Sequence, residues 1–172
     1  MSQAYKGSHG KIGVFGGSYE YCGASFFAAM SALKYGADLS SIICSPDAAI
    51  PIKSYSPDLI VFPSLYDIPA CMELIPRFDS IVIGPGAGRS ESAVASMKQI
   101  IPKAIESAKV VVLDGDALWL LSQDKSILPS DFGSCTVVLT PNFMELTRLC
   151  HTYLDRTPRD VSRNFSGKLG KD

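Results

Sequence analysis

The sequence carries little net charge of either sign. It contains 16 Lys and Arg residues against 17 Asp and Glu residues, for a formal charge of −1 at pH 7, and its pI is about 6.1. Proteins that hold nucleic acid or anionic lipid need a basic field at their surface. We therefore expect neither nucleic acid nor a membrane as a partner.

Long apolar runs and metal-binding cysteine patterns are also absent from the sequence. No apolar run approaches the roughly 20 residues that span a bilayer, and residues 1–11 lack the apolar stretch of a secretory signal. The five cysteines are widely spaced and form no CxxC pair, which favours reduced thiols over a zinc or redox site. We expect a cytoplasmic protein, or a mitochondrial one if a longer precursor exists.

Six short runs rich in β-branched residues are present. They are continuous rather than alternating, which is the pattern of strands covered on both faces in a parallel sheet. The expected strands are residues 12–15, 41–44, 59–62, 80–83, 110–113 and 136–139.

Helical patterns lie between and after these runs. The expected helices are residues 24–35, 92–107, 117–123, 143–153 and 158–169, with a kink or break at Pro102. Alternation of strand and helix at this spacing is typical of an α/β layered domain. With no linker or repeat in view, we expect one domain over residues 1–172.

Turn-forming residues follow five of the expected strands, at 16–18, 45–47, 84–86, 114–116 and 140–142. The ligand crevice of an open parallel sheet lies just beyond the carboxyl ends of the strands. These five turns should therefore converge on one site.

Two of the turns are rich in glycine. In GGSYEYCGA (16–24), Gly17 and Ser18 could approach a phosphate, or the turn could simply need positive φ, and it lacks the GxGxxG spacing of a dinucleotide fingerprint. In GPGAGR (84–89), backbone amides could form an anion nest to which Arg89 adds a contact. The alternative there is a plain glycine turn with a surface arginine.

The last two turns carry acidic side chains. Asp116 fits the N-cap of the helix that follows it, so Asp114 is the better candidate ligand for a ribose or Mg²⁺. Asn142 and Glu145 lie three residues apart at a helix start, where they could orient Mg²⁺ through water. They could equally form a capping box, and spacing alone does not separate the two.

Several blocks together carry a family resemblance: KGSHG, FGGSYEYCGA, SIICSPDAAIPIKSYSPDLIVFP, VIGPGAGR, VLDGDALWLL and VLTPNFMELTRL. In order and approximate spacing the chain resembles the NAD(P)H-hydrate dehydratases, and its third block is similar to the eukaryotic ATP-using branch. The resemblance implies a ribokinase-like three-layer α/β/α fold with a mostly parallel central sheet. Another ribokinase-like small-molecule kinase is disfavoured, because such kinases do not generally share the block at 41–63.

The resemblance also implies a reaction. ATP phosphorylates the ring hydroxyl of the S epimer of NAD(P)H hydrate, phosphate departs, and NAD(P)H is restored with ADP and phosphate as by-products. The implied ligands are the hydrate, ATP and Mg²⁺, and the implied pathway partner is an NAD(P)H-hydrate epimerase. Positioning and charge neutralisation dominate such phosphoryl transfer.

Residue by residue, the family's motifs assign three groups. The hydrate-binding residues are Gly86, Gly88, Asp114, Asn142, Phe143, Met144, Glu145, Leu146, Thr147 and Arg148. The weaker nucleotide or phosphate candidates are Lys6, Gly17, Ser18 and Arg89. Asn142 and Glu145 match the NxxE pattern found near Mg²⁺. The family's KG turn for ATP and its GxGD aspartate base have no match up to Asp172.

Those two unmatched motifs lead to further expectations. Residues 1–172 alone should show negligible turnover, either as part of a longer enzyme or as a catalytically silent nucleotide-binding fragment. Strands missing from the sheet should leave apolar surface exposed, which favours association such as a homo-oligomer.

Overall fold

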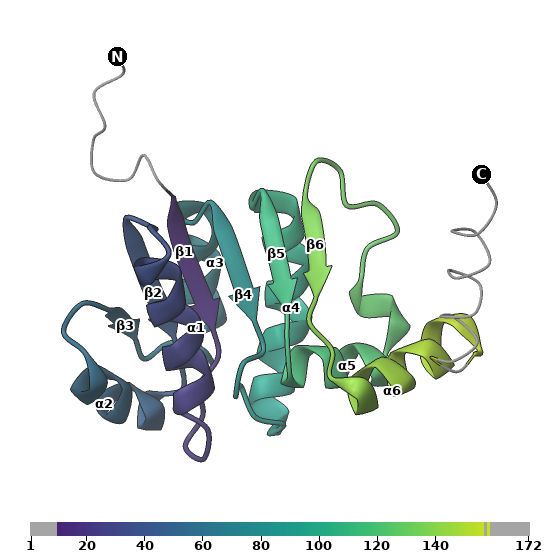
Figure 1. Ribbon diagram of the computed structural model, residues 1–172, viewed down its shortest axis with the longest axis horizontal. Coiled ribbons are helices and arrows are strands. Elements are labelled where there is room, and N and C mark those ends of the chain that lie inside the picture. Colours follow the sequence, from purple (N-terminus) through teal and green to yellow (C-terminus); the bar gives the residue numbers. More distant parts are fainter. Residues whose placement is uncertain (1–9, 157, 159–172) are drawn as a thin grey trace, which may run out of the picture.

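The computed structural model describes residues 10–156 and 158 and contains one parallel sheet (Figure 1). Its strands are β1 (Lys11–Phe15), β2 (Leu39–Ile43), β3 (Ile60–Phe62), β4 (Ser80–Ile83), β5 (Val110–Leu113) and β6 (Thr136–Leu139). The order across the sheet is β3-β2-β1-β4-β5-β6, and each neighbouring pair is parallel. The expected α/β class and parallel sheet are confirmed.

The chain reverses its direction of travel across the sheet at β1. From β1 it moves outward to β2 and β3, then returns to place β4 on the other side of β1. In the register, Val14 of β1 pairs with Ile42 on one side and with Val82 on the other. Ligand crevices of open parallel sheets form where the strand order reverses, outside the carboxyl ends. The fold thus predicts a site between the ends of β1 and β4.

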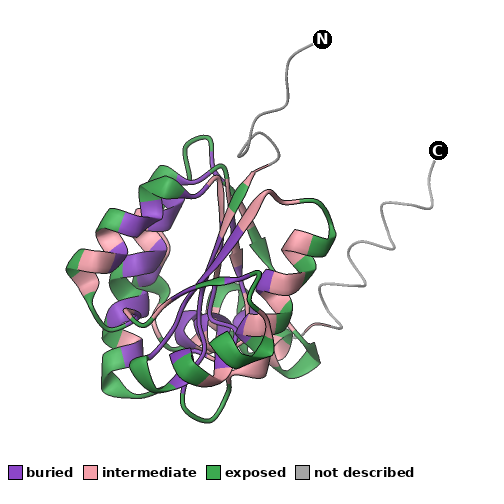
Figure 2. Ribbon diagram, turned by 90° about the vertical axis from the view of Figure 1, so that its left-hand side faces the viewer, coloured by how far each residue is buried: buried purple, intermediate pink, exposed green. Residues whose placement is uncertain are grey.

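Helices lie on both faces of the sheet (Figures 1 and 2). Their bounds are α1 (Gly23–Lys34), α2 (Pro46–Tyr55), α3 (Ile68–Leu74), α4 (Glu91–Ser107), α5 (Asp116–Gln123) and α6 (Phe143–Leu154), with 3-10 turns η1 (Ile75–Arg77) and η2 (Lys125–Ile127). Because side chains alternate along a strand, Val14 packs with α1 and α2, whereas Phe15 packs with α3 and α4. This gives the three-layer arrangement.

Coverage of the sheet changes from one end to the other. At β5, Val111 is buried while Val112, on the opposite face, is half-buried. At β6, Val138 and Leu139 are 39% and 41% exposed. The expectation that every strand is covered on both faces is therefore wrong for β6, whereas the expected exposed apolar sheet surface is found there.

Two helices, α2 and α3, were not expected from the sequence. Each begins at a side-chain cap followed by proline in the first turn: Ser45 accepts from the Ala48 N–H, and Asp67 accepts from the Ala70 N–H. From the sequence, Pro46 was expected in a turn. Conversely, α4 continues through Pro102 without interruption. The expected helix 158–169 lies outside the described residues except for Pro158.

The five cysteines are free thiols, and four of them are buried. Burial raises the pKa of Cys44 to about 11 and that of Cys71 to about 12. These thiols are therefore protonated at neutral pH and unsuited to thiolate chemistry. Within residues 10–156, no helix has both the length and the apolar character needed to cross a bilayer.

Candidate functional site

A cavity of about 590 Å³ lies beyond the carboxyl ends of the central strands. The turn after β1, the turn after β4, the start of α5 and the start of α6 each contribute to its wall. Its lining residues are Glu20, Tyr21, Ala24, Gly86, Gly88, Arg89, Gly115, Asp116 and Glu145. The cavity occupies the position that the strand-order reversal predicts.

Two of the five expected turns, 84–86 and 114–116, contribute residues to this cavity. The segments after β1 and β6 reach it through Glu20, Tyr21 and Glu145 rather than through residues 16–18 and 140–142. The turn after β2 does not reach it. In that turn Ser45 is buried, its hydroxyl caps α2, and its backbone N–H donates to the Gly17 carbonyl at 3.0 Å. The expectation that residues 45–47 join the site is therefore wrong. Through this hydrogen bond Ser45 stabilises the turn after β1.

Residues 84–89, which we call the glycine turn, need glycine for steric reasons. Gly84 and Gly86 have φ values of 109° and 59°, in the region that side chains disfavour. A Cβ atom at Gly84 would overlap the Asp114 carbonyl, and one at Gly86 would lie 2.5 Å from the Tyr21 carbonyl oxygen. The glycine turn is thus packed directly against the backbones of its two neighbouring turns.

Gly17 and Ser18 brace the glycine turn and do not line the cavity. The Gly17 N–H donates to the Pro85 carbonyl at 3.0 Å, so this amide is already engaged within the protein. Ser18 is buried, and its hydroxyl has no hydrogen-bond partner among the described residues. Beyond them, Glu20 and Tyr21 line the cavity. The sequence did not indicate Glu20 and Tyr21, because its glycines pointed to residues 16–18 as the ligand contacts.

The two aspartates after β5 make contacts that differ from those expected. The N-cap of α5 is Gly115, which makes no side-chain cap, and Asp116 is the first helical residue. The Asp116 carboxylate accepts from the Gly88 N–H at 2.9 Å and from Arg89 Nε at 2.9 Å. Asp114 Oδ1 accepts from the Thr140 hydroxyl at 2.8 Å and is outside the cavity lining. The cap assignment for Asp116 is wrong.

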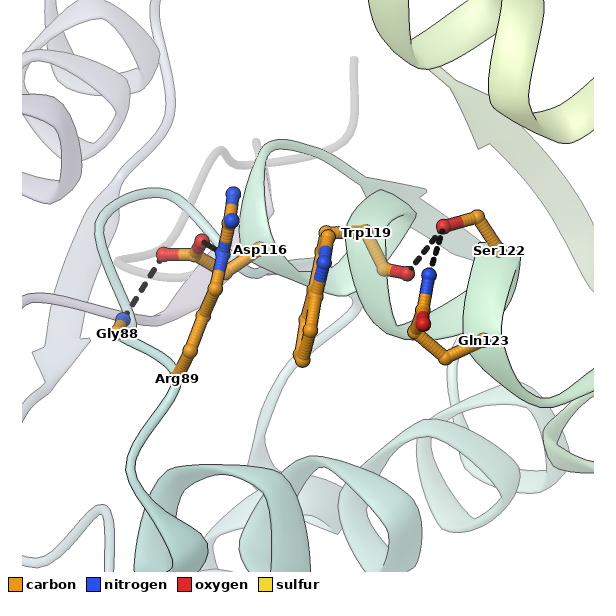
Figure 3. Close-up of polar contacts among 6 residues, drawn as sticks. All are labelled: Gly88, Arg89, Asp116, Trp119, Ser122 and Gln123. Carbon is orange, nitrogen blue, oxygen red and sulfur yellow. Dashed lines mark hydrogen bonds and ion pairs between the residues drawn. The ribbon is translucent and has the colours of Figure 1, made fainter.

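Figure 3 shows Arg89 held between two residues of α5. Its Nε donates to Asp116, and its guanidinium lies over the Trp119 ring, 4.8 Å from the ring centroid. The Gly88 N–H was expected to bind an anionic ligand as part of an anion nest. In the structure it donates to the Asp116 carboxylate instead. What the cavity offers to an anion is the rest of the Arg89 guanidinium.

Asn142 and Glu145 form the capping box that the sequence left open as an alternative. Asn142 Oδ1 accepts from the Glu145 N–H at 3.0 Å, and Glu145 Oε2 accepts from the Asn142 N–H at 2.8 Å. Among the described residues, no group of three His, Cys, Asp or Glu side chains could hold a metal ion. Glu145 remains a cavity residue, with one carboxylate that could face a nucleotide-bound Mg²⁺, which often takes only one or two protein carboxylates.

The other expected residues of α6 lie outside the cavity lining. Phe143 and Met144 are 66% and 58% exposed, Arg148 is exposed, and the Thr147 hydroxyl donates to the Phe143 carbonyl. Leu146 lines a separate apolar groove along β6, α5 and α6. Lys6 lies outside the described residues.

The cavity therefore combines one guanidinium with three carboxylates. Glu20, Asp116 and Glu145 can accept hydrogen bonds from hydroxyl or amide groups, while Arg89 can bind phosphate. Burial raises the pKa of Cys22, in the loop after β1, so the adjacent thiol is not a ready nucleophile. The arrangement suits a polyhydroxylated, phosphorylated ligand.

Comparison with known proteins gives a consistent match. A family model described as NAD(P)H-hydrate dehydratase matches residues 12–171. Named ATP-dependent (S)-NAD(P)H-hydrate dehydratases include one from Danio rerio, 49% identical over 94% of this chain and 48% of its own, and one from Pongo abelii, 44% identical over 98% of this chain and 51% of its own. The chain spans about half the length of these relatives.

Solved structures match the fold as well. A ribokinase-like superfamily protein from Enterococcus faecalis superposes with a TM-score of 0.80 at 25% identity, over 99% of this chain and 58% of its own. An ADP/ATP-dependent NAD(P)H-hydrate dehydratase from Bacillus subtilis, co-crystallised with ATP and Mg²⁺, gives 0.65 at 18% identity, over 98% of this chain and 55% of its own. The ribokinase-like fold expected from the sequence is confirmed.

Proposed function

This chain belongs to the NAD(P)H-hydrate dehydratase family, and we propose that it serves the ATP-dependent dehydration of the S epimer of NAD(P)H hydrate. The products are NAD(P)H, ADP and phosphate, which makes the reaction a step of nicotinamide nucleotide repair. The observation that carries the proposal is the joining of the glycine turn, Asp116 and Glu145 in one cavity at the strand-order reversal.

The chemistry calls for positioning more than for a nucleophile on the protein. The ring hydroxyl of the hydrate is a poor leaving group, and its phosphorylation by ATP converts it into a good one. The γ-phosphoryl group then bonds to that oxygen, the bond to ADP breaks and the hydroxyl proton is lost. Phosphate later leaves as the ring nitrogen supplies electrons, and loss of a proton from the neighbouring ring carbon restores the double bond of NAD(P)H. A site of backbone turns, one guanidinium and hydrogen-bond acceptors supplies the orientation and charge balance for such a step.

Within this chain, we assign the residues as follows. Arg89 contacts a phosphate of the bound dinucleotide, and Glu20 and Asp116 border the space for ribose or carboxamide groups. Glu145 would face Mg²⁺ through water when the ion enters with ATP, where it neutralises phosphate charge. The epimerase as pathway partner and the cytoplasmic location stay predictions from the sequence.

Equilibrium dialysis with the purified S and R epimers of NADH hydrate tests the binding part of the proposal. We expect saturable binding of the S epimer to residues 1–172, with weaker binding of the R epimer. The matched ligand without the ring hydroxyl, NADH, controls for general dinucleotide affinity. Absence of S-hydrate binding would contradict the proposal.

Turnover is tested by absorbance of the restored reduced ring in the presence of the S hydrate, ATP and Mg²⁺. We expect residues 1–172 by themselves to bind without measurable turnover, and a longer form, if the cell makes one, to restore NADH with one ADP released per ring. Saturable binding without turnover by the protein isolated from its cell would instead support the alternative, a catalytically silent nucleotide-binding protein.

A further inference from the structure

Asp116 joins the start of α5 to the glycine turn through both carboxylate oxygens. Oδ2 accepts from the Gly88 N–H and Oδ1 accepts from Arg89 Nε, each at 2.9 Å. The Asp116 side chain is only 14% exposed, whereas that of Arg89 is 53% exposed. A charge-assisted pair in which one partner is largely shielded from solvent is stronger than an ordinary surface ion pair. Asp116, at the start of α5, thus fixes the position of residues 88 and 89 in the neighbouring glycine turn.

Trp119 completes the support of Arg89. One turn along α5 from Asp116, its ring lies under the guanidinium at 4.8 Å from the centroid, so the two side chains hold Arg89 from an edge and a face (Figure 3). A guanidinium has five N–H donors, and Asp116 binds only the one at Nε. The remaining four belong to a side chain that is more than half exposed at the cavity.

The charges around the cavity make the orientation of Arg89 decisive. Among the residues that the structure describes, the other charged side chains in its lining, Glu20, Asp116 and Glu145, are acidic. Within that part of the chain, a phosphate in this cavity depends on Arg89 for an opposite charge, and without Arg89 facing it the phosphate would meet carboxylates.

We propose that Asp116 is a positioning residue of the dehydration site: by anchoring Gly88 and Arg89, it makes the free edge of the guanidinium available to a phosphate group of the dinucleotide hydrate. This inference rests on the proposed function for its ligand. The phosphate can belong to the diphosphate bridge or, in NADPH hydrate, to the 2′-phosphate, and the two hydrates distinguish these sources.

The test is a double-mutant cycle on binding of S-NADH hydrate and S-NADPH hydrate, measured by equilibrium dialysis. We expect Asp116→Asn and Arg89→Ala each to raise the Kd about tenfold, and the double variant to be no weaker than Arg89→Ala alone, because Asp116 acts through Arg89. An equal loss of affinity for both hydrates would identify the diphosphate bridge as the group that Arg89 binds. A larger loss of affinity for S-NADPH hydrate would identify the 2′-phosphate. An unchanged Kd in Asp116→Asn, or a full additional loss in the double variant, would overturn the proposal.

Asp124→Asn is the matched control. Asp124 forms an ion pair of the same length, 2.9 Å to Lys98 Nζ, at the opposite end of α5 and outside the cavity lining. Its removal should leave hydrate affinity unchanged. If Asp116→Asn does not fold, Arg89→Lys serves as the second variant: it keeps the charge but loses the planar fork, and an affinity equal to wild type would count against the proposal.

Trp119 separates failure of this inference from failure of the proposed function. It is the chain's only tryptophan, so its fluorescence reports the Arg89 stack without any ligand. We expect Asp116→Asn and Arg89→Ala to change the ligand-free emission in the same way, and Asp124→Asn to leave it unchanged. Absence of hydrate binding by the wild type would refute the proposed function even where this emission change is present. Unchanged emission in Asp116→Asn would refute the anchoring itself.

Discussion

Around β1, in the middle of the sheet, helices cover both faces and the turns pack backbone against backbone, whereas at the β6 edge, among the described residues, apolar side chains are exposed to solvent. Val14 and Phe15 of β1 are fully buried on opposite faces, while Val138 and Leu139 of β6 are about 40% exposed. The cavity lies between these two regions. Its wall at the glycine turn is therefore fixed by packing, and its wall at α6 starts at a local capping box, from which the helix runs along α5.

The exposed apolar surface at β6 continues onto the neighbouring helices. The apolar groove along β6, α5 and α6 is lined by Leu139, Leu146 and Leu149 among others. Residues of α6 that the family motif assigns to the hydrate, such as Phe143 and Met144, are exposed as well.

The largest expected effect is at the glycine turn, in the packed middle of the sheet. Gly84→Ala should destabilise the protein by about 3 kcal/mol or more, because its Cβ would overlap the Asp114 carbonyl at a φ that favours glycine. Gly133→Ala is the matched control before β6, with positive φ but nothing within 4 Å of the added Cβ, and should cost about 1 kcal/mol. Urea denaturation measures both, and equal losses would remove the contrast between the two regions.

A valine pair tests the same contrast in the strands. Val111→Ala removes methyl groups from a fully buried site in β5 and should cost about 2 to 3 kcal/mol. Val138→Ala in the adjacent strand β6 should cost less than about 1 kcal/mol, since that side chain is already 39% exposed. A loss at Val138 as large as at Val111 would show that β6 is covered in solution.

The capping box allows stability and binding to be separated at α6. Asn142→Ala should cost about 1 kcal/mol in unfolding free energy, and Asn142→Asp, which keeps the cap, should cost much less. Glu145→Gln keeps the box but removes the charge, so it should alter hydrate or ATP affinity several-fold with little change in stability. If affinities for both ligands are unchanged in Glu145→Gln, the pair serves only to cap the helix.

The smallest effect concerns pH at the far end of α5. Hydrogen bonds from Ser126, then the Lys98 contact, lower the pKa of Asp124 to about 2, against about 4 in an unfolded chain. A lowered folded-state pKa stabilises the protein above pH 4, and this contribution is lost as the pH falls towards 2. The Tm difference between wild type and Asp124→Asn should shrink over that interval. A Tm difference that stays constant with pH would show that the contacts of the Asp124 carboxylate with Ser126 and Lys98 are not retained in solution.

Much of the fold was predictable because apolar periodicity encodes it locally. All six strands were expected within a few residues. Helix α2 was missed because Pro46 was placed in a turn, although proline suits a helix's first turn, and the seven-residue α3 was not expected either. The site was harder to predict, since it depends on partners far apart in sequence. Asp116 reads as a cap from its local context, and only the fold brings it to Gly88 and Arg89, 28 and 27 residues away.

Hydrogen exchange with and without S-NADH hydrate locates the ligand most directly. We predict slower exchange of backbone amides in residues 20–24, 86–89 and 115–116 when the S hydrate is bound, with residues 125–139 unchanged and with little effect from the R epimer. Protection confined to the β6 end, or none at the glycine turn at saturating S hydrate, would contradict the assignment of the cavity as the hydrate site.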